Sequence, residues 1–432
     1  MEYFSLHKNA PNVSFKEAVI RGLAPDKGLY FPSEIKPLSK HFFEDIGEMT
    51  EVEIALEVIK PFVGDDIPEA DLKNILVDTL NFKFPLTEID QNLYALELYH
   101  GPTLAFKDVG ARFMARCLGY FNQQNQNPQD VTVLVATSGD TGGAVASGFF
   151  KVPGVEVVIL FPKGKVSDIQ EKQLTTFGEN ITAIEVEGTF DDCQEMVKTA
   201  FLDEELLVHK KLTSANSINV ARWLPQMFYY FFAYKQLKSK GFPLVFSVPS
   251  GNFGNICAGM MAQKLGLPIH HFISGTNANE VVPRYLDSGI YDPKPSIATI
   301  SNAMDVGSPS NFIRIQEIYN NDISTLRKNL SAYGYSDAET EKALIYLYAE
   351  KGYIADPHGA IGYLAARKYL DENPENLAVF LETAHPVKFK DVIPADISEK
   401  IIIPQSIQAI LHKKKEAETI STYSQLKSKL LN

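Results

Sequence analysis

The chain has 432 residues, 45% of them hydrophobic and 22% charged, and its acidic residues outnumber its basic ones by 53 to 41. This length predicts two or three domains, because single hydrophobic cores stop growing near roughly 250 to 300 residues. The composition excludes a disordered or fibrous chain, and the formal net charge of −12 argues against nucleic acid and anionic membrane as partners.

Cysteine usage and the apolar runs indicate the compartment. Cys117, Cys193 and Cys257 are odd in number and match no zinc or redox spacing, so we expect buried, reduced thiols. The N-terminus shows no signal-peptide pattern, and no stretch approaches the ~18 apolar residues of a membrane span. We therefore expect a cytoplasmic protein. We also expect no metal site, because no cluster of His, Cys or carboxylate residues has metal-ligand spacing.

The first part of the chain predicts a mainly helical domain. Residues 43–63 and 68–82 have the apolar spacing of helices, and Gly and Pro residues punctuate the region. The region contains no cluster of residues with catalytic potential. We assign residues 1–88 to this N-terminal domain.

Lys107 follows a turn fixed by Gly101 and Pro102 and a pair of apolar residues, in the run HGPTLAFKD. An ammonium group among apolar neighbours loses solvation, which lowers its pKa and makes the nucleophilic amine available for carbonyl chemistry. A lone lysine is more often a surface charge. The local sequence alone therefore leaves both interpretations open.

From Val131 the pattern changes to short β-rich runs, each followed by a turn and a helical stretch. The runs are VTVLVA, VEVVILF, ITAIEVEG, PLVFSVP, HHFISG and LAVFLE. Strands that alternate with helices predict an α/β fold with parallel sheets. A junction is expected near Gly241, where a helical segment ends before the next strand, and the charged helices beyond Lys390 are expected to be exposed.

Two of the predicted strands run into small-residue loops that precede helices. The first loop is TSGDTGG, residues 137–143, and the second is SGNFGN, residues 250–255. The first amides of a helix lack internal partners, and small residues let an anion approach them, so each loop is a candidate anion site or a tight connection. Neither loop has the residues that define a dinucleotide or nucleoside-triphosphate site. A phosphorylated cofactor and an anionic substrate fit better.

A third candidate is the run NSINVAR, residues 216–222, which groups amides, a hydroxyl and a guanidinium. The planar guanidinium of Arg222 suits phosphate. Alternatively, Ser217 or Asn219 caps a helix and Arg222 lies on the exposed side of its first turn. The residues alone favour the cap.

Several runs together resemble the threonine synthase family, of the bacterial and fungal type. They are HGPTLAFKD, TSGDTGGA, NSINVAR, SVPSGNFGN, SNAMDV and TAHPVKF, in that order, with SFKEAVIRGLAPDKGLYFP resembling the additional N-terminal domain of that family. The family belongs to the fold-type II pyridoxal-phosphate enzymes. The resemblance implies two open α/β sheet domains with pyridoxal 5'-phosphate in the cleft between them. We expect a large domain of residues 89–115 and 242–432 and a small domain of residues 116–241.

The resemblance also implies roles for individual residues. Lys107 becomes the Schiff-base lysine and the catalytic base, and Thr383 faces the pyridine nitrogen. The cofactor phosphate is expected at the amides of Ser250, Gly251, Asn252, Phe253, Gly254 and Asn255. The substrate is expected at Ser138, Gly139, Asp140 and Thr141 through its carboxylate, and at Asn216, Ser217 and Arg222 through its phosphate.

The implied reaction converts O-phospho-L-homoserine and water to L-threonine and phosphate, the last step of threonine biosynthesis. The alternatives are another fold-type II lyase, such as a threonine or serine dehydratase or a phospholyase, and a non-catalytic sensor of a phosphorylated ligand. We expect a small-molecule substrate, no nucleic acid or membrane partner, and a monomer or small homo-oligomer. Two residues stand out. Asp140 puts a charge where many fold-type II enzymes have Asn, and Glu382 stands before Thr383 where a small residue is expected.

Overall fold

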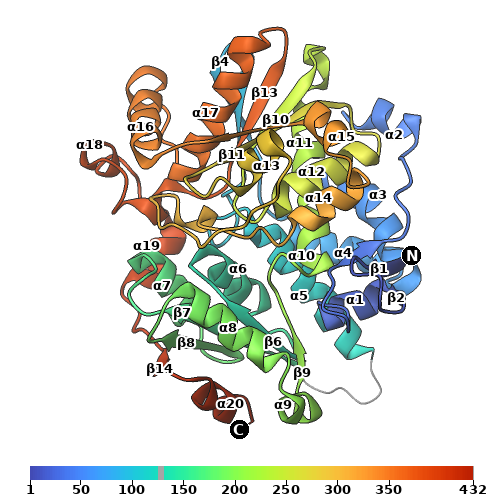
Figure 1. Ribbon diagram of the computed structural model, residues 1–432, viewed down its shortest axis with the longest axis vertical. Helices are drawn as coiled ribbons and strands as arrows, with labels where there is room; N and C mark the ends of the chain where they lie inside the picture. The colour runs from blue at the N-terminus through green and yellow to red at the C-terminus, as the bar shows by residue number, and fades with distance from the viewer. Residues whose placement is uncertain (125–130, 432) are drawn as a thin grey trace.

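The computed structural model describes residues 1–124 and 131–431, which form three sheets and the helices that cover them (Figure 1). The two larger sheets are mainly parallel and belong to two α/β bodies, and the third sheet is part of the N-terminal region. The predicted α/β fold with two open sheets is confirmed. Residues 125–130 of the predicted small domain and residue 432 of the predicted large domain lie outside the described residues.

The N-terminal region combines helices with a small antiparallel sheet, which the prediction of a mainly helical domain did not include. Its strand order is β2-β1-β3. Thr50 and Glu53 form a capping box that starts the longest helix of this region, since each side chain accepts from the other's backbone amide. The elements are β1 (Glu2–Ser5), β2 (Val13–Ser14), α1 (Phe15–Arg21), β3 (Tyr30–Pro32), α2 (Lys40–Asp45), α3 (Glu51–Val63) and α4 (Glu69–Thr79).

The larger body has a six-stranded sheet in the order β12-β11-β10-β13-β5-β4, parallel except for β4 at its edge. Its central strands are buried along their whole length, as expected for a parallel sheet covered on both faces. The strands are β4 (Leu86–Asp90), β5 (Leu93–Glu97), β10 (Leu244–Pro249), β11 (Ile269–Thr276), β12 (Leu330–Gly334) and β13 (Leu377–Glu382). The helices are α12 (Gly254–Lys264), α13 (Val281–Ser288), α14 (Phe312–Ile318), α15 (Ile323–Asn329), α16 (Asp337–Lys351), α17 (Pro357–Glu372) and α18 (Ala395–Ser398).

The smaller body has a five-stranded parallel sheet in the order β14-β8-β7-β6-β9. The strands are β6 (Val131–Ala136), β7 (Val155–Pro162), β8 (Ile181–Val186), β9 (Lys211–Thr213) and β14 (Glu418–Ile420). The helices are α6 (Asp140–Phe149), α7 (Asp168–Thr175), α8 (Phe190–Ala200), α9 (Glu204–His209), α19 (Gln405–Leu411) and α20 (Tyr423–Leu431). All six β-rich runs expected from the sequence are strands of the two larger sheets.

The C-terminal segment returns to the smaller body, although the sequence-based division places residues 242–432 in the large domain. Strand β14 pairs with β8, and α20 packs on α8 and α9. The strand has three residues, of which Ile420 alone is buried, so the sequence offers no run of apolar residues to predict it. Figure 1 shows this segment at the bottom of the molecule, far along the chain from its neighbours.

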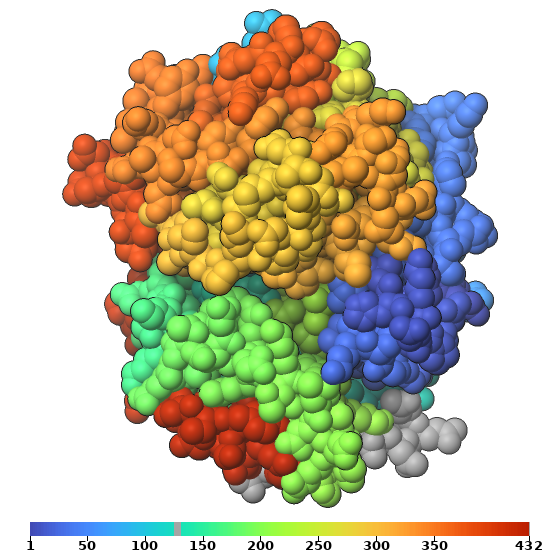
Figure 2. Space-filling view, viewed as in Figure 1, coloured from blue at the N-terminus to red at the C-terminus, as the bar shows by residue number. Residues whose placement is uncertain are grey.

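The three regions are held together by a central group of buried helices. Helix α5 (Lys107–Gln123) packs on α4, α6 and α10 (Val220–Trp223), and α11 (Met227–Leu237) packs on α3 and α12. The aromatic run Phe228–Phe232 of α11 is buried, as expected for core. Figure 2 shows the yellow and orange residues of the larger body meeting the green residues of the smaller body, with blue N-terminal residues beside both.

Candidate functional site

The predicted site residues follow the carboxyl ends of parallel strands in both bodies. One loop follows β6, one follows β10, and a third follows β13. In open α/β sheets, ligands bind at the carboxyl ends of the strands. Side-chain contacts described below join the loops of the two bodies, so the fold brings these separate runs of sequence to one place.

Lys107 is the first residue of α5, and backbone hydrogen bonds tie the segment before it to the end of β13. Phe106 N donates to Thr383 O at 2.9 Å, and His385 N donates to Leu104 O at 3.0 Å. Leu104 adopts a φ of 60°, in the left-handed region, which turns the chain into the helix. Thr383 is therefore fixed against the residues that carry Lys107.

The amine of Lys107 lies among other charged groups of the site. Burial lowers the pKa of Lys107 to about 8; Asp140 opposes this shift, whereas Lys388 and Arg222 add to it. A pKa in this range leaves a large fraction of the amine neutral near pH 8, which carbonyl chemistry and proton transfer both require.

The loop after β6 forms a tight turn around Thr137. The Thr137 hydroxyl accepts from Gly139 N at 3.0 Å and from Gly142 N at 2.9 Å. Gly139 has a φ of 142°, and a Cβ there would lie 2.5 Å from the Gln170 side chain, so glycine is required. Within the described part of the chain, the amides of Ser138, Asp140 and Thr141 donate to no other residue. These three amides are available to an anion.

Asp140 itself is engaged by side chains rather than open to a ligand. Its Oδ1 lies 2.7 Å from Lys388 Nζ and accepts from Gln170 Nε2 at 2.9 Å. Burial alone would raise the pKa of Asp140, but the ammonium groups of Lys388 and Lys107 hold it well below its usual range. The carboxylate is therefore ionised and compensated.

The loop after β10 presents backbone amides. Phe253 has a φ of 58° and precedes α12, and the amides of residues 251–256 donate to no residue that the structure describes. Asn255 Nδ2 is buried without a partner, although Asn255 Oδ1 accepts from Tyr230 at 2.8 Å. A Cβ on Gly251 would lie 2.6 Å from Met304 Cα. An unpaired buried donor beside free helix amides fits a phosphate group.

The run 216–222 forms a loop and the short helix α10. Asn219 is the N-cap, since its side chain accepts from Ala221 N at 3.0 Å. Arg222 is 4% exposed, so it does not lie on an outer helix face. Its Nη1 donates to Ala215 O at 2.8 Å, its Nε has no partner, and it forms no ion pair with any carboxylate of the described residues. Desolvation lowers the pKa of Arg222 to about 10. A buried cation without a counter-ion favours an anionic ligand.

Ser217 joins this run to the loop after β10. Its hydroxyl accepts from Asn252 Nδ2 and from Asn311 Nδ2, each at 3.0 Å. Asn216 Nδ2 donates to Ala136 O at 3.3 Å, at the end of β6. The predicted cofactor and substrate loops are therefore in direct contact.

Asn311 and Arg314 belong to the site's framework and were not predicted. Arg314 is fully buried, stacks at 4.2 Å on Trp223, and donates to Ser217 O at 3.0 Å and to Ile218 O at 2.6 Å. Both residues lie outside the motifs. A buried arginine in an otherwise ordinary helix leaves no local signal in the sequence.

Glu382 is the last residue of β13, and its side chain packs against Gly359 in α17. The group is fully buried, and its Oε2 accepts from Asp356 N at 3.4 Å. Burial, together with the nearby Asp356, raises the pKa of Glu382 well above its usual range. This shift favours the protonated, neutral form of Glu382, directly beside Thr383.

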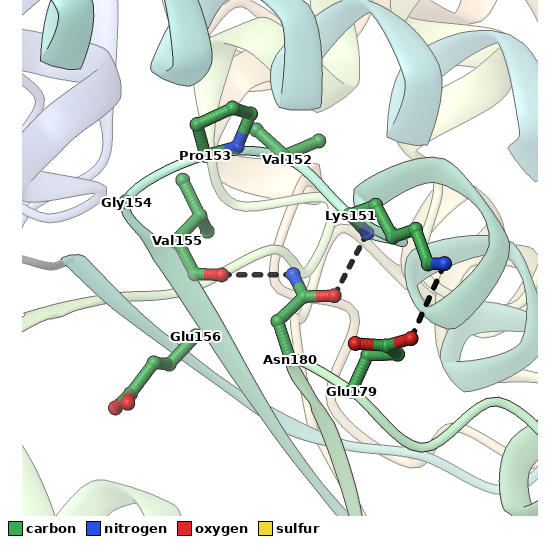
Figure 3. A pocket seen from close by; sticks show the side chains of 8 residues that line it. All are labelled: Lys151, Val152, Pro153, Gly154, Val155, Glu156, Glu179 and Asn180. Atoms are coloured by element: carbon green, nitrogen blue, oxygen red, sulfur yellow. Dashed lines mark hydrogen bonds and ion pairs between the residues drawn. The ribbon is translucent and has the colours of Figure 1, made fainter.

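A surface depression elsewhere on the smaller body involves none of these residues (Figure 3). Its polar groups pair with one another, since Lys151 N donates to Asn180 Oδ1 and Asn180 Nδ2 donates to Val155 O, each at 2.8 Å.

Among the described residues, no group of three or more His, Cys, Asp or Glu is arranged to hold a metal ion. Nor does any helix of residues 1–124 and 131–431 have the length and apolar character to span a membrane.

Comparisons with known proteins cover nearly the whole chain. Residues 77–383 match the model of the pyridoxal-phosphate dependent enzymes, residues 2–80 the threonine synthase N terminus, and residues 359–429 the threonine synthase C-terminal region. The threonine synthase of Escherichia coli is 42% identical over 408 residues, 94% of each chain.

Solved structures of threonine synthases resemble the whole molecule. The crystal structure of threonine synthase from Escherichia coli matches with a TM-score of 0.93 at 40% identity and covers 100% of both chains. The structure of pyridoxal-phosphate-bound threonine synthase from Brucella melitensis matches with a TM-score of 0.93 at 35% identity and covers 100% of this chain and 99% of that one.

Proposed function

The chain belongs to the threonine synthase family of pyridoxal-phosphate enzymes. From this premise we propose which residues carry out each part of the conversion of O-phospho-L-homoserine and water to L-threonine and phosphate. The enzyme is a pyridoxal-phosphate-dependent lyase of threonine biosynthesis. The observation that carries the assignment of roles is the placing of Lys107 and the buried, uncompensated Arg222 beside two sets of free helix amides.

The residues present fit the cofactor. Lys107 would attach it covalently, the amides of residues 251–255 and Asn255 Nδ2 would hold its phosphate, and Thr383 would face its ring nitrogen. The Ser250 amide, expected from the sequence to be part of this cradle, instead donates to Gly275 O at 2.8 Å. Once bound, pyridoxal phosphate supplies a conjugated ring that delocalises the negative charge left on the substrate when a proton departs. The neutral hydroxyl of Thr383 favours protonation of that nitrogen less than a carboxylate would.

Lys107 Nζ is proposed as the group that moves protons. With a pKa near 8, the amine can accept a proton from the substrate Cα and donate it again within one turnover. A proton leaves Cβ as well, phosphate departs from Cγ, and Cγ then gains a proton. Water adds its hydroxyl at Cβ, and Cα regains a proton. The same lysine therefore serves as tether and as acid and base.

The substrate is proposed to be held at both ends. The amides of Ser138, Asp140 and Thr141 and the tight turn at Gly139 would receive its carboxylate, and Asn216, Ser217 and Arg222 would receive its phosphate. One charged hydrogen bond from Arg222 contributes roughly 1.5 to 3 kcal/mol, a tenfold to hundredfold effect on binding. Holding the phosphate limits diversion to a keto acid.

The test is the purified protein with phosphohomoserine, with threonine and phosphate followed together. Equal amounts of both products support the assignment, whereas release of 2-oxobutyrate without threonine would indicate a dehydratase or phospholyase instead. Lys107→Ala is expected to lose both the reaction and the visible colour of the covalently held cofactor. Colour that persists unchanged in that variant would refute the role of Lys107. A cytoplasmic location and a monomer or small homo-oligomer complete the proposal.

A further inference from the structure

Lys388 is a second buried lysine beside the site. It lies in the short 3-10 helix Pro386–Phe389 that follows β13, and it is 1% exposed. A buried ammonium group is stable only when a negative group and further acceptors surround it. Its partners therefore indicate what it does.

The partners of Lys388 connect the two bodies of the molecule. Its Nζ lies 2.7 Å from Asp140 Oδ1 and donates to Thr103 O at 2.9 Å. Thr103 O also accepts from Gln173 Nε2 at 3.0 Å, and Asp140 Oδ1 accepts from Gln170 Nε2 at 2.9 Å. Lys388 and Thr103 belong to segments that follow strands of the six-stranded sheet, whereas Asp140 and the two glutamines belong to α6 and α7. The ion pair therefore crosses between the bodies at the site.

We propose that Lys388 is a positioning residue for the reaction, because its ion pair with Asp140 keeps that carboxylate from pairing with Lys107 and so keeps the Lys107 amine available for proton transfer. This inference rests on the proposed role of Lys107. It assigns to Lys388 an effect on Lys107 through Asp140, and no contact with the substrate.

The charges around Lys107 determine the direction of the effect. Three charged groups face it: Asp140 from α6, Lys388 from the segment after β13, and Arg222 from α10. Burial lowers the pKa of Lys107, Asp140 raises it, and Lys388 and Arg222 lower it. Removing Lys388 takes away one positive charge and leaves Asp140 uncompensated, and both changes raise the pKa of Lys107.

Two other titratable groups, Asp108 and His385, lie near Lys388. Asp108 is buried and is held by Thr103, whose N and Oγ1 donate to its carboxylate at 2.9 and 2.6 Å. His385 starts the helix of Lys388, and burial lowers the pKa of His385 to about 4. Asp108 has its own donors and His385 is neutral near pH 7, so neither replaces Asp140 as the partner of Lys388.

The experiment compares three holoenzymes by the pH dependence of their visible absorbance, which follows protonation of Lys107 Nζ where it is bonded to the cofactor: wild type, Lys388→Met, and Lys388→Met combined with Asp140→Asn. The single variant is expected to titrate about one pH unit or more above wild type, since an uncompensated carboxylate then faces Lys107. The double variant removes that carboxylate and is expected to return to within about 0.3 unit of wild type. Lys390→Met, two residues away, is the matched control.

The outcomes separate the inference from the function on which it rests. If the midpoint of the absorbance titration is the same in Lys388→Met as in wild type, the inference is overturned. It is also overturned if the midpoint of the double variant remains shifted by as much as that of the single variant. If the single variant does not fold, Asp140→Asn and the double variant decide together. A midpoint lowered in Asp140→Asn and restored in the double variant supports the proposal, whereas a midpoint unchanged in Asp140→Asn, or not restored in the double variant, contradicts it. The variant Lys107→Ala tests the proposed function itself. A visible band that persists in this variant would contradict the proposed role of Lys107, and would not bear on the role of Lys388.

Discussion

The two α/β bodies each bring a buried carboxyl group to the edge of the site, and they stabilise it in opposite ways. Asp140 of the smaller body keeps its charge, because Lys388 lies 2.7 Å away and Gln170 donates to it. Glu382 of the larger body holds its proton, because burial and Asp356 raise its pKa. Burial alone therefore does not determine the charge of an acid, and the partner that the fold supplies decides.

The largest expected effect comes from breaking the ion pair. Asp140→Asn leaves Lys388 as a buried ammonium without a counter-ion, and we expect a loss of about 3–5 kcal/mol in the free energy of unfolding, measured by urea denaturation. Glu382→Gln is the matched amide substitution on the other body, and it replaces an acid that is already neutral. Equal losses in the two variants would contradict the contrast between the two carboxyl groups.

Gly359→Ala is expected to have the next largest effect on stability, because the added Cβ would overlap with the side chain of Glu382. A Cβ at Gly359 would lie 2.1 to 2.4 Å from the carboxyl atoms of Glu382. The overlap is expected to cost about 1–3 kcal/mol of stability, as overpacking in a core does. Gly362→Ala in the same helix is the control, since its Cβ would approach nothing closer than 3.3 Å. Equal stability of the two variants would show that Glu382 moves aside freely.

Sequence patterns predicted the strands and loops that build this contrast, and left its charges unresolved. The run VTVLVA predicts β6 because its β-branched and apolar residues are typical of a strand that is buried on both faces. The charge of Asp140 depends on Lys388, which lies far along the chain, and that distance in sequence hides the pairing. Likewise, Arg222 and its surroundings gave opposing local interpretations, a helix cap or a ligand, and packing placed Asn219 as the cap and buried the guanidinium.

The neutral state of Glu382 also predicts a pH dependence of stability. The folded pKa of Glu382 lies above the unfolded value of about 4.5, so the acid is protonated in both states below that pH, and stability is then greatest. As the pH rises towards the folded pKa, the unfolded chain releases a proton that the folded one holds, and stability falls by up to about 1.4 kcal/mol per pH unit.

Glu382→Gln removes this dependence, which is why it sharpens the comparison with Asp140. We expect the stability of the variant relative to wild type to increase as the pH is raised from 5 to 7. Denaturation curves recorded at each half pH unit measure this difference. A difference that is constant over this range would mean that Glu382 is already ionised in the folded protein. Asp140, whose folded pKa is lowered, contributes in the opposite sense, since its stabilisation is lost as the pH falls below its unfolded value.

The smallest effect is expected at Thr383, the residue next to Glu382 that is proposed to face the ring nitrogen of the cofactor. Thr383→Val keeps the shape of the side chain and removes the hydroxyl, so stability without cofactor should change little. One neutral hydrogen bond contributes about 0.5–1.5 kcal/mol, and cofactor affinity is expected to fall about twofold to tenfold, as measured by absorbance during dialysis against known cofactor concentrations. Thr383→Ser, which keeps the hydroxyl, should bind more tightly than the valine variant. Equal affinities for serine and valine would mean that the hydroxyl does not reach the cofactor, and that the larger body contributes only packing at this position.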